Sequence, residues 1–168
     1  MKEHGMKASF KATGQTGVLI AENGVVIDAI ISDFISGAVE WLSPDNEEDH
    51  WDIIEGQGSL FHPSFAGVSL GLLHGSQPDK FIVCHEPTRS NMRGVENKLP
   101  SISEVISKTI ELGKLTNPDI KCAGIALNTS NMLNKSEDMK KMISDKHSMP
   151  CLDPLKDDLS DFINMINK

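Results

Sequence analysis

The sequence predicts an α/β fold with an open, mostly parallel sheet between two layers of helices. Short apolar runs alternate with longer segments of helical periodicity along the chain, a pattern typical of parallel βαβ units. The length of 168 residues, without an internal repeat or an obvious linker, indicates one domain over residues 1–168. Polar residues and glycines follow several of the apolar runs, as they do at the ligand-binding edge of such sheets.

We expect five strands and five main helices. Ser101 and Glu104 form a capping-box pattern at the start of one helix, and Gly5 has the character of a residue that ends a helix. Residues 14–17 are expected to form a turn, with residues 18–20 either extending the strand before it or beginning another element. The strands are expected at 8–13, 51–55, 80–84, 121–127 and 149–152, and the helices at 33–42, 65–73, 101–113, 136–143 and 156–166.

Composition limits the class of protein. The net charge of -8 argues against nucleic acid or an anionic membrane as the main partner, because both bind basic surfaces. No apolar run approaches the length of a membrane span, and residues 1–12 lack the apolar segment of a signal peptide. The odd number of three cysteines does not suit a disulfide framework. We therefore expect a cytoplasmic protein.

Candidate site residues follow the expected strands. Carboxyl ends of parallel strands share one edge of a sheet, so these residues are expected to converge on one crevice. They are Thr13, Gln15, Thr16, Glu55, His85 and Asn128.

The turn Glu55-Gly56-Gln57-Gly58 is the sharpest local signal. A carboxylate at the end of a buried strand needs a hydrogen-bond partner or a cation. Gly56 and Gly58 allow the backbone to approach a ligand and to direct N–H groups at an anion. Glu55 can thus be a general base, a Mg²⁺ ligand, or a carboxylate that only accepts hydrogen bonds from the turn.

His85 and Arg89 are the other chemical candidates. His85 follows an apolar strand and is the best general acid or base, although a hydrogen-bonded histidine without a catalytic role fits equally well. Arg89 suits the binding of a carboxylate or phosphate, and a surface ion pair is the alternative. The histidine and cysteine spacings do not fit zinc, and the sequence contains no G-x-x-x-x-G-K-[ST] loop.

Several motifs together resemble the C-terminal domain of the DUF1611 family. They are A-T-G-Q-T-G (12–17), D-F-I-S-G-A-V-E (33–40), E-G-Q-G-S-L-F-H-P-S-F-A-G-V-S-L-G-L-L-H-G (55–75), Q-P-D (77–79) and H-E-P-T-R (85–89). The family includes D-glutamate N-acetyltransferases. The resemblance implies a P-loop NTPase-like domain whose E-G-x-G turn is similar to that of dethiobiotin synthetases, where the carboxylate serves magnesium-nucleotide binding.

The chain also departs from the family pattern. Family members have an N-terminal Rossmann-like domain, a first strand, a Walker A-type loop and a first helix before the segment that begins here. The resemblance therefore implies an N-terminally truncated domain, either homo-oligomeric or completed by a missing N-terminal segment.

The leading hypothesis is an acetyl-CoA-dependent N-acetyltransferase with an amino acid, D-glutamate by resemblance, as its small-molecule substrate. His85 would be the base, with Glu55 as second choice, the 56–58 N–H groups would stabilise the oxyanion, and Arg89 would bind carboxylate or phosphate. Two alternatives remain open. One is an ATP-dependent ligase or carboxylase similar to dethiobiotin synthetase, which would use a Mg-nucleotide, and the other is a non-catalytic oligomerisation remnant.

Overall fold

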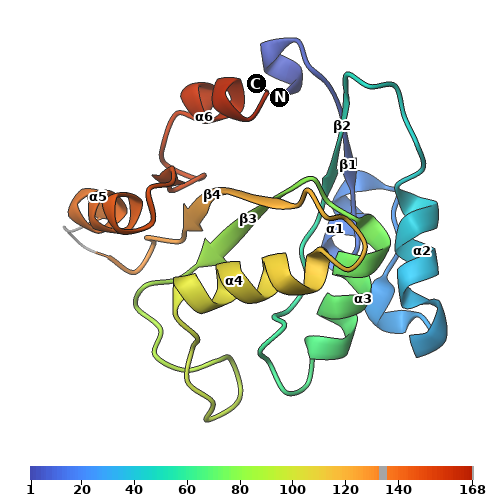
Figure 1. The fold of residues 1–168 in the computed structure, drawn as a ribbon, viewed down its shortest axis with the longest axis horizontal. Helices are drawn as coiled ribbons and strands as arrows, with labels where there is room; N and C mark the ends of the chain where they lie inside the picture. The colour runs from blue at the N-terminus through green and yellow to red at the C-terminus, as the bar shows by residue number, and fades with distance from the viewer. Residues whose placement is uncertain (133–135, 168) are drawn as a thin grey trace. The chain divides into compact units, whose positions relative to one another are not determined.

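The computed structural model describes residues 1–132 and 136–167 and has the predicted α/β architecture with parallel strands (Figure 1). The chain divides into two compact units. The N-terminal unit is Met1–Pro78 with Leu115–Asn117, and the C-terminal unit is Asp79–Lys114 with Pro118–Lys168. Within the described residues, no helix has both the length and the apolar character needed to cross a membrane.

The N-terminal unit is built on two parallel strands. Strands β1 (Lys7–Lys11) and β2 (His50–Ile54) pair from Lys7 opposite His50 to Lys11 opposite Ile54. The helices are α1 (Gln15–Ala21), α2 (Ile35–Leu42) and α3 (Ala66–Ser76), with 3-10 turns η1 (Lys2–His4), η2 (Ile27–Ala29) and η3 (Ser32–Phe34).

Helices α2 and α3 lie side by side in this unit (Figure 1). Gly75 makes the close approach possible, because a Cβ atom there would lie 2.3 Å from the carbonyl oxygen of Ser36. The core between these helices and the sheet contains Ile27, Val39 and Leu72, all buried.

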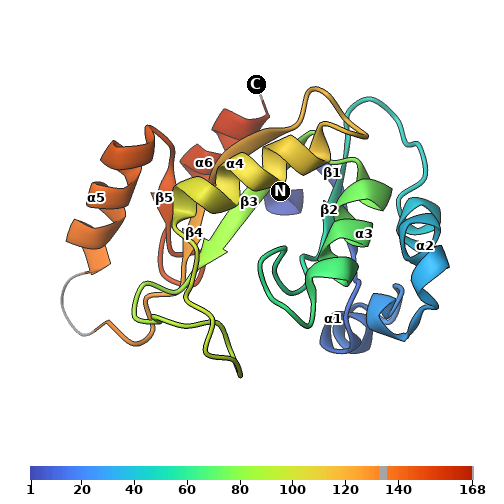
Figure 2. The same ribbon diagram turned by 60° about the horizontal axis from the view of Figure 1, so that its bottom comes forward.

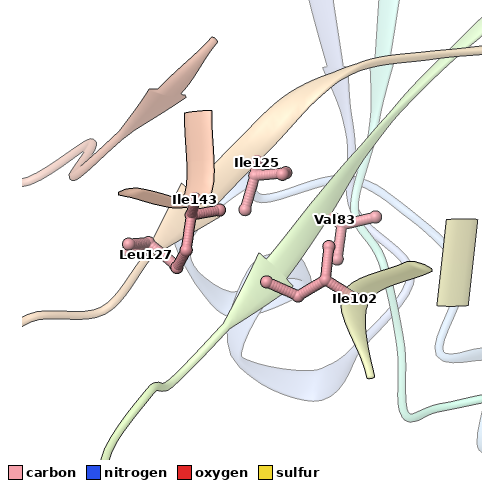
Figure 3. Packing of buried hydrophobic residues seen from close by; sticks show 5 residues of the cluster. All are labelled: Val83, Ile102, Ile125, Leu127 and Ile143. Carbon is pink, nitrogen blue, oxygen red and sulfur yellow. The ribbon is translucent and has the colours of Figure 1, made fainter. Parts of the chain in front are cut away.

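The C-terminal unit has a three-stranded parallel sheet in the order β3-β4-β5. Its strands are β3 (Lys80–His85), β4 (Lys121–Leu127) and β5 (Cys151–Leu152), and its helices are α4 (Ile102–Gly113), α5 (Ser136–His147) and α6 (Ser160–Ile166). Helix α4 packs on β3 and β4, and α5 packs beside β5 (Figure 2). Their apolar faces meet the sheet in a core of Val83, Ile102, Ile125, Leu127 and Ile143 (Figure 3).

Most of the expected elements are confirmed. All five strands form, with ends shifted by at most two residues, and all strand pairs are parallel. The capping box at α4 is present: the Ser101 hydroxyl accepts from the Glu104 N–H, and the Glu104 carboxylate accepts from the Ser101 N–H. Gly5 ends η1 in the left-handed conformation, with φ of 74°.

Three expectations are corrected. The strands pair as two sheets of two and three strands, rather than as one sheet of five. Residues 15–17 are the start of helix α1 (Gln15–Ala21) rather than part of a turn, and residues 18–20 belong to this helix rather than extending the strand before it. Helix α6 begins at Ser160 rather than at residue 156, because the Asp153 carboxylate accepts from the Leu155 N–H, and the Asp158 carboxylate from the Ser160 N–H, which favours turns there.

Candidate functional site

Glu55 connects the carboxyl ends of β1 and β2 in the N-terminal unit. Its backbone N–H continues the sheet by donating to the Lys11 carbonyl at 3.0 Å. Its carboxylate oxygen Oε2 accepts from the N–H groups of Thr13 at 2.9 Å and Gly14 at 3.0 Å. These N–H groups immediately precede α1, so a carboxylate about forty residues along the chain holds the start of that helix.

Thr13 completes this arrangement. It is fully buried, its hydroxyl donates to the Glu55 carbonyl at 2.7 Å, and the same hydroxyl accepts from the Gln57 amide at 3.1 Å. Two glycines leave the space that these side chains occupy. A Cβ atom on Gly14 would lie 2.6 Å from the Gln57 Nε2 atom, and one on Gly17 would lie 2.1 Å from Glu55 Oε2.

These contacts favour one of the interpretations left open for Glu55. Two N–H donors on one oxygen are what a carboxylate with a role in holding the turn requires. No group of three or more His, Cys, Asp or Glu side chains suited to a metal occurs among the described residues. The hydrogen-bonded role of Glu55 is therefore present in the structure, and its role towards Mg²⁺ or a Mg-nucleotide stays a prediction.

The remaining predicted site residues of this unit follow shortly after Gly14 or Glu55 in the sequence, and they are exposed at the surface. Gln15 and Thr16 begin α1 and are exposed, and so are Gly56 and Gly58. Gly58 packs closely, because a Cβ atom on it would lie 2.7 Å from the Phe65 Cβ atom. The turn thus passes directly in front of the start of α3.

His85 and Asn128 lie at the carboxyl ends of neighbouring strands in the C-terminal unit. The Asn128 N–H donates to the His85 carbonyl at 2.9 Å. Burial lowers the pKa of His85 below its ordinary value of 6.5, while the nearby Glu86 carboxylate acts in the opposite direction. The imidazole is therefore neutral at pH 7, which is the form that a general base requires.

Arg89 forms an ion pair with Glu86, with 2.5 Å between Nη2 and Oε2. A surface ion pair was the alternative that the sequence left open to a ligand-binding role for Arg89. The Glu86 carboxylate also accepts from the Thr88 hydroxyl at 2.9 Å and from the Asn131 amide at 3.1 Å. These bonds, led by the one from Thr88, lower the pKa of Glu86. The loops after β3 and β4 are thereby joined at the edge that carries His85 and Asn128.

A buried polar cluster after β4 and β5 was not anticipated from the sequence. Asp153 is 1% exposed, and it accepts from the fully buried Thr129 through the hydroxyl at 2.5 Å and the N–H at 3.2 Å. The Lys156 ammonium donates to the Thr129 hydroxyl at 2.7 Å. The Thr129 hydrogen bond is the main cause of the lowered pKa of Asp153. The signal was available: like Glu55, Asp153 is a carboxylate directly after an apolar strand.

The structure thus brings the predicted residues together as two sets. Within the N-terminal unit, the set is Thr13, Gln15, Thr16, Glu55, Gly56 and Gly58, and within the C-terminal unit it is His85, Arg89 and Asn128. A hollow of about 250 Å³ in the N-terminal unit lies elsewhere, against β1 and α2, and none of these residues lines it. The polar strand ends, rather than this hollow, remain the candidate site.

Comparison with known proteins gives consistent matches. The family model described as the DUF1611 domain of unknown function (DUF1611_C), P-loop domain, matches residues 1–163. A D-glutamate N-acetyltransferase from a Pseudoalteromonas species is 52% identical over 165 residues, which are 97% of this chain and 50% of that protein. One from Tritonibacter scottomollicae is 46% identical over 159 residues, covering 93% of this chain and 47% of that protein.

A solved structure agrees with these matches. The crystal structure of a DUF1611 family protein from Anabaena variabilis superposes with a TM-score of 0.85 at 31% identity, covering 92% of this chain and 46% of that one. The chain spans about half the length of the relatives it matches. On this sequence and structural similarity, the chain belongs to the DUF1611 family and consists of its P-loop domain.

Proposed function

We propose that this chain is part of an N-acetyltransferase that acetylates the amino group of an acidic amino acid, D-glutamate in the first place, with acetyl-CoA as donor. The observation that carries the proposal is the 52% identity to a D-glutamate N-acetyltransferase over 97% of the chain. Both curated relatives have that name, and they match 97% and 93% of this chain.

His85 is the proposed base. A substrate ammonium group must lose a proton before its nitrogen can attack the acetyl carbonyl, and a neutral imidazole can accept that proton. Burial keeps His85 neutral at pH 7, which supports this role. The C–N bond then forms and the C–S bond breaks; one of the two protons lost from nitrogen goes to the coenzyme A thiolate and the other to solvent.

Glu55 has a different role in this scheme. Its hydrogen bonds to Thr13 and Gly14 make it the group that fixes the strand ends of the N-terminal unit, and this weakens the case for Glu55 as a base. In the N-terminal unit, these contacts hold the turn of Gly56 to Gly58 in place. We propose that the backbone N–H groups of this turn donate to an anionic group of a ligand.

Arg89 is proposed to bind a substrate carboxylate or a coenzyme phosphate. A guanidinium group has five N–H donors, and the contact with Glu86 uses the Nη2 atom. In the part of the chain that the structure describes, the remaining nitrogens have no other acceptor, and we propose that they bind an oxyanion in bidentate fashion. The half-exposed position of Arg89, with 44% of its side chain exposed, allows a ligand to reach it.

The activity of the whole relatives is itself part of the proposal, because this chain spans half of their length. We propose that a segment corresponding to their other half, or a second copy of this chain, completes the active protein. In either case we propose a cytoplasmic location, in keeping with three cysteines, an odd number that does not suit a disulfide framework.

The test is an assay of acetyl transfer with D-glutamate and acetyl-CoA, following release of the coenzyme A thiol. The chain is assayed alone and after coexpression with the other half of the Pseudoalteromonas relative, with L-glutamate as the substrate control. Acetyl-D-glutamate formed without nucleotide supports the proposal, and His85→Gln should abolish it while His147→Gln leaves it unchanged. Absence of product in both preparations, or strict dependence on ATP, refutes the proposal.

A further inference from the structure

The first turn of helix α3 lacks the side chains that usually balance the partial positive charge of a helix N-terminus. The helix has 11 residues, and Phe65 at its N-cap makes no side-chain capping bond. Its first turn contains no acidic residue. Helix N-termini carry a partial positive charge that capping side chains or acidic residues usually balance. Within the described residues, neither an N-cap side chain nor an acidic residue of the first turn provides this compensation.

Two N–H groups in that first turn are available to a ligand. The Ala66 N–H donates to the His62 carbonyl and the Ser69 N–H to the Phe65 carbonyl. For the N–H groups of Gly67 and Val68, the described part of the chain provides no acceptor. Gly67 is exposed, and a Cβ atom built on it would meet nothing within 4 Å, so solvent and small molecules can reach these donors.

Ser69 supplies the second, independent observation. It is 9% exposed, and its hydroxyl has no hydrogen-bond partner within the described residues. Side chains on a helix point back towards its N-terminus, so this hydroxyl faces the first turn. It lies 3.4 Å from the position that a Cβ atom on Gly58 would occupy. A buried hydroxyl without a partner is unfavourable, and an incoming acceptor would remove that cost.

We propose that the N-terminus of α3, with Gly67, Val68, Ser69 and the adjoining Gly58, binds an oxyanion group of a small ligand. The N–H groups of Gly67 and Val68 donate to the ligand oxygens, and the ligand supplies the acceptor that the Ser69 hydroxyl lacks. Gly58 is required beside this site, because any larger residue fills the space in front of Ser69.

This inference deepens the proposed function and rests on it for the identity of the ligand, which is then a carboxylate of the acidic amino acid. A phosphate group has the same chemistry at a helix N-terminus. Both sources are therefore tested by direct binding to the complete chain, with D-glutamate and inorganic phosphate as separate probes. Binding of these probes does not depend on acetyl transfer. The proposed binding site can therefore be absent while the proposed activity is present, and the activity can be absent while the probes still bind.

Three variants change the proposed site, and a fourth variant on another helix is the matched control. Gly67→Asp places a competing carboxylate on the first turn, and Gly67→Asn is its neutral counterpart. Gly37→Asp on α2 is the control for net charge, because a Cβ atom on Gly37 also meets nothing within 4 Å. Ser69→Ala removes the hydroxyl, and circular dichroism checks that each variant is folded.

Isothermal titration calorimetry measures the outcome. The expected result is that Gly67→Asp and Ser69→Ala each weaken binding of at least one probe by about tenfold or more, while Gly67→Asn and Gly37→Asp stay within about twofold of the wild type. Weaker binding of D-glutamate alone identifies a carboxylate site, and weaker binding of phosphate alone identifies a phosphate site. Absence of binding by the wild type, or equal binding by all variants, overturns the inference.

Discussion

Replacing Glu55 tests whether this carboxylate holds the N-terminal unit together. Its Oε2 atom accepts two backbone hydrogen bonds, at 2.9 and 3.0 Å. A hydrogen bond to a charged group contributes about 1.5–3 kcal/mol, and partial replacement by water reduces the loss. Glu55→Ala is therefore expected to lower the free energy of unfolding by about 3 kcal/mol. Glu55→Gln, which keeps one acceptor oxygen without the charge, should lower it by about 1–2 kcal/mol.

Tryptophan fluorescence during urea denaturation gives a suitable assay. The protein has two tryptophans, Trp41 and Trp51, and both belong to the N-terminal unit. The fluorescence transition therefore reports that unit, while circular dichroism reports the whole chain.

Glu40→Gln is the matched control, because Glu40 is an exposed residue on α2 and its replacement removes the same charge. The expected order of midpoints is Glu40→Gln equal to wild type, then Glu55→Gln, then Glu55→Ala. If both Glu55 variants unfold within about 0.5 kcal/mol of the control, the carboxylate does not stabilise this unit and the reasoning is wrong.

Three further predictions follow from the same contacts. Gly17→Ala puts a methyl group 2.1 Å from Glu55 Oε2, so the fluorescence transition should shift to lower urea by as much as in the Glu55 variants; an unchanged midpoint contradicts this packing. Asp153→Asn removes a buried charge and should destabilise the C-terminal unit by about 2 kcal/mol in urea denaturation followed by circular dichroism, and a neutral effect contradicts it. Because burial lowers the pKa of His85, the unfolded chain binds more protons between that pKa and 6.5, so stability falls as the pH drops through this window. His85→Gln should reduce the difference in stability between pH 7.5 and pH 5.5, whereas His147→Gln should not.

Local sequence patterns were sufficient for most elements. The strands 80–84 and 121–127 are short apolar runs that each begin at a lysine and are followed by a polar residue, and both are present in the structure. Helix α4 was predicted with its capping box because Ser101, Glu104 and the apolar spacing all lie within one segment. Such features depend on interactions between residues close in sequence, so the sequence displays them directly.

Two of the mispredicted features depend on distant contacts. Residues 15–21 contain three β-branched residues and a glycine, and they have weak helical character on their own. They form α1 where the Glu55 carboxylate, from the end of another strand, accepts the N–H groups that precede the helix. The pairing of five strands into two sheets is likewise a matter of tertiary structure.

For the candidate site, the sequence determined which residue types stand at the strand ends. Glu55, His85, Arg89 and Asn128 were identified because apolar runs stop there and polar groups begin. Only the tertiary structure decided the surroundings of each side chain. Glu55 accepts from two N–H groups, and Arg89 forms an ion pair with the Glu86 carboxylate. Burial lowers the pKa of His85 and so keeps its imidazole neutral at pH 7. The physical reason is that hydrogen bonding and desolvation depend on atoms brought together by folding, and a residue's position in the sequence does not specify those atoms.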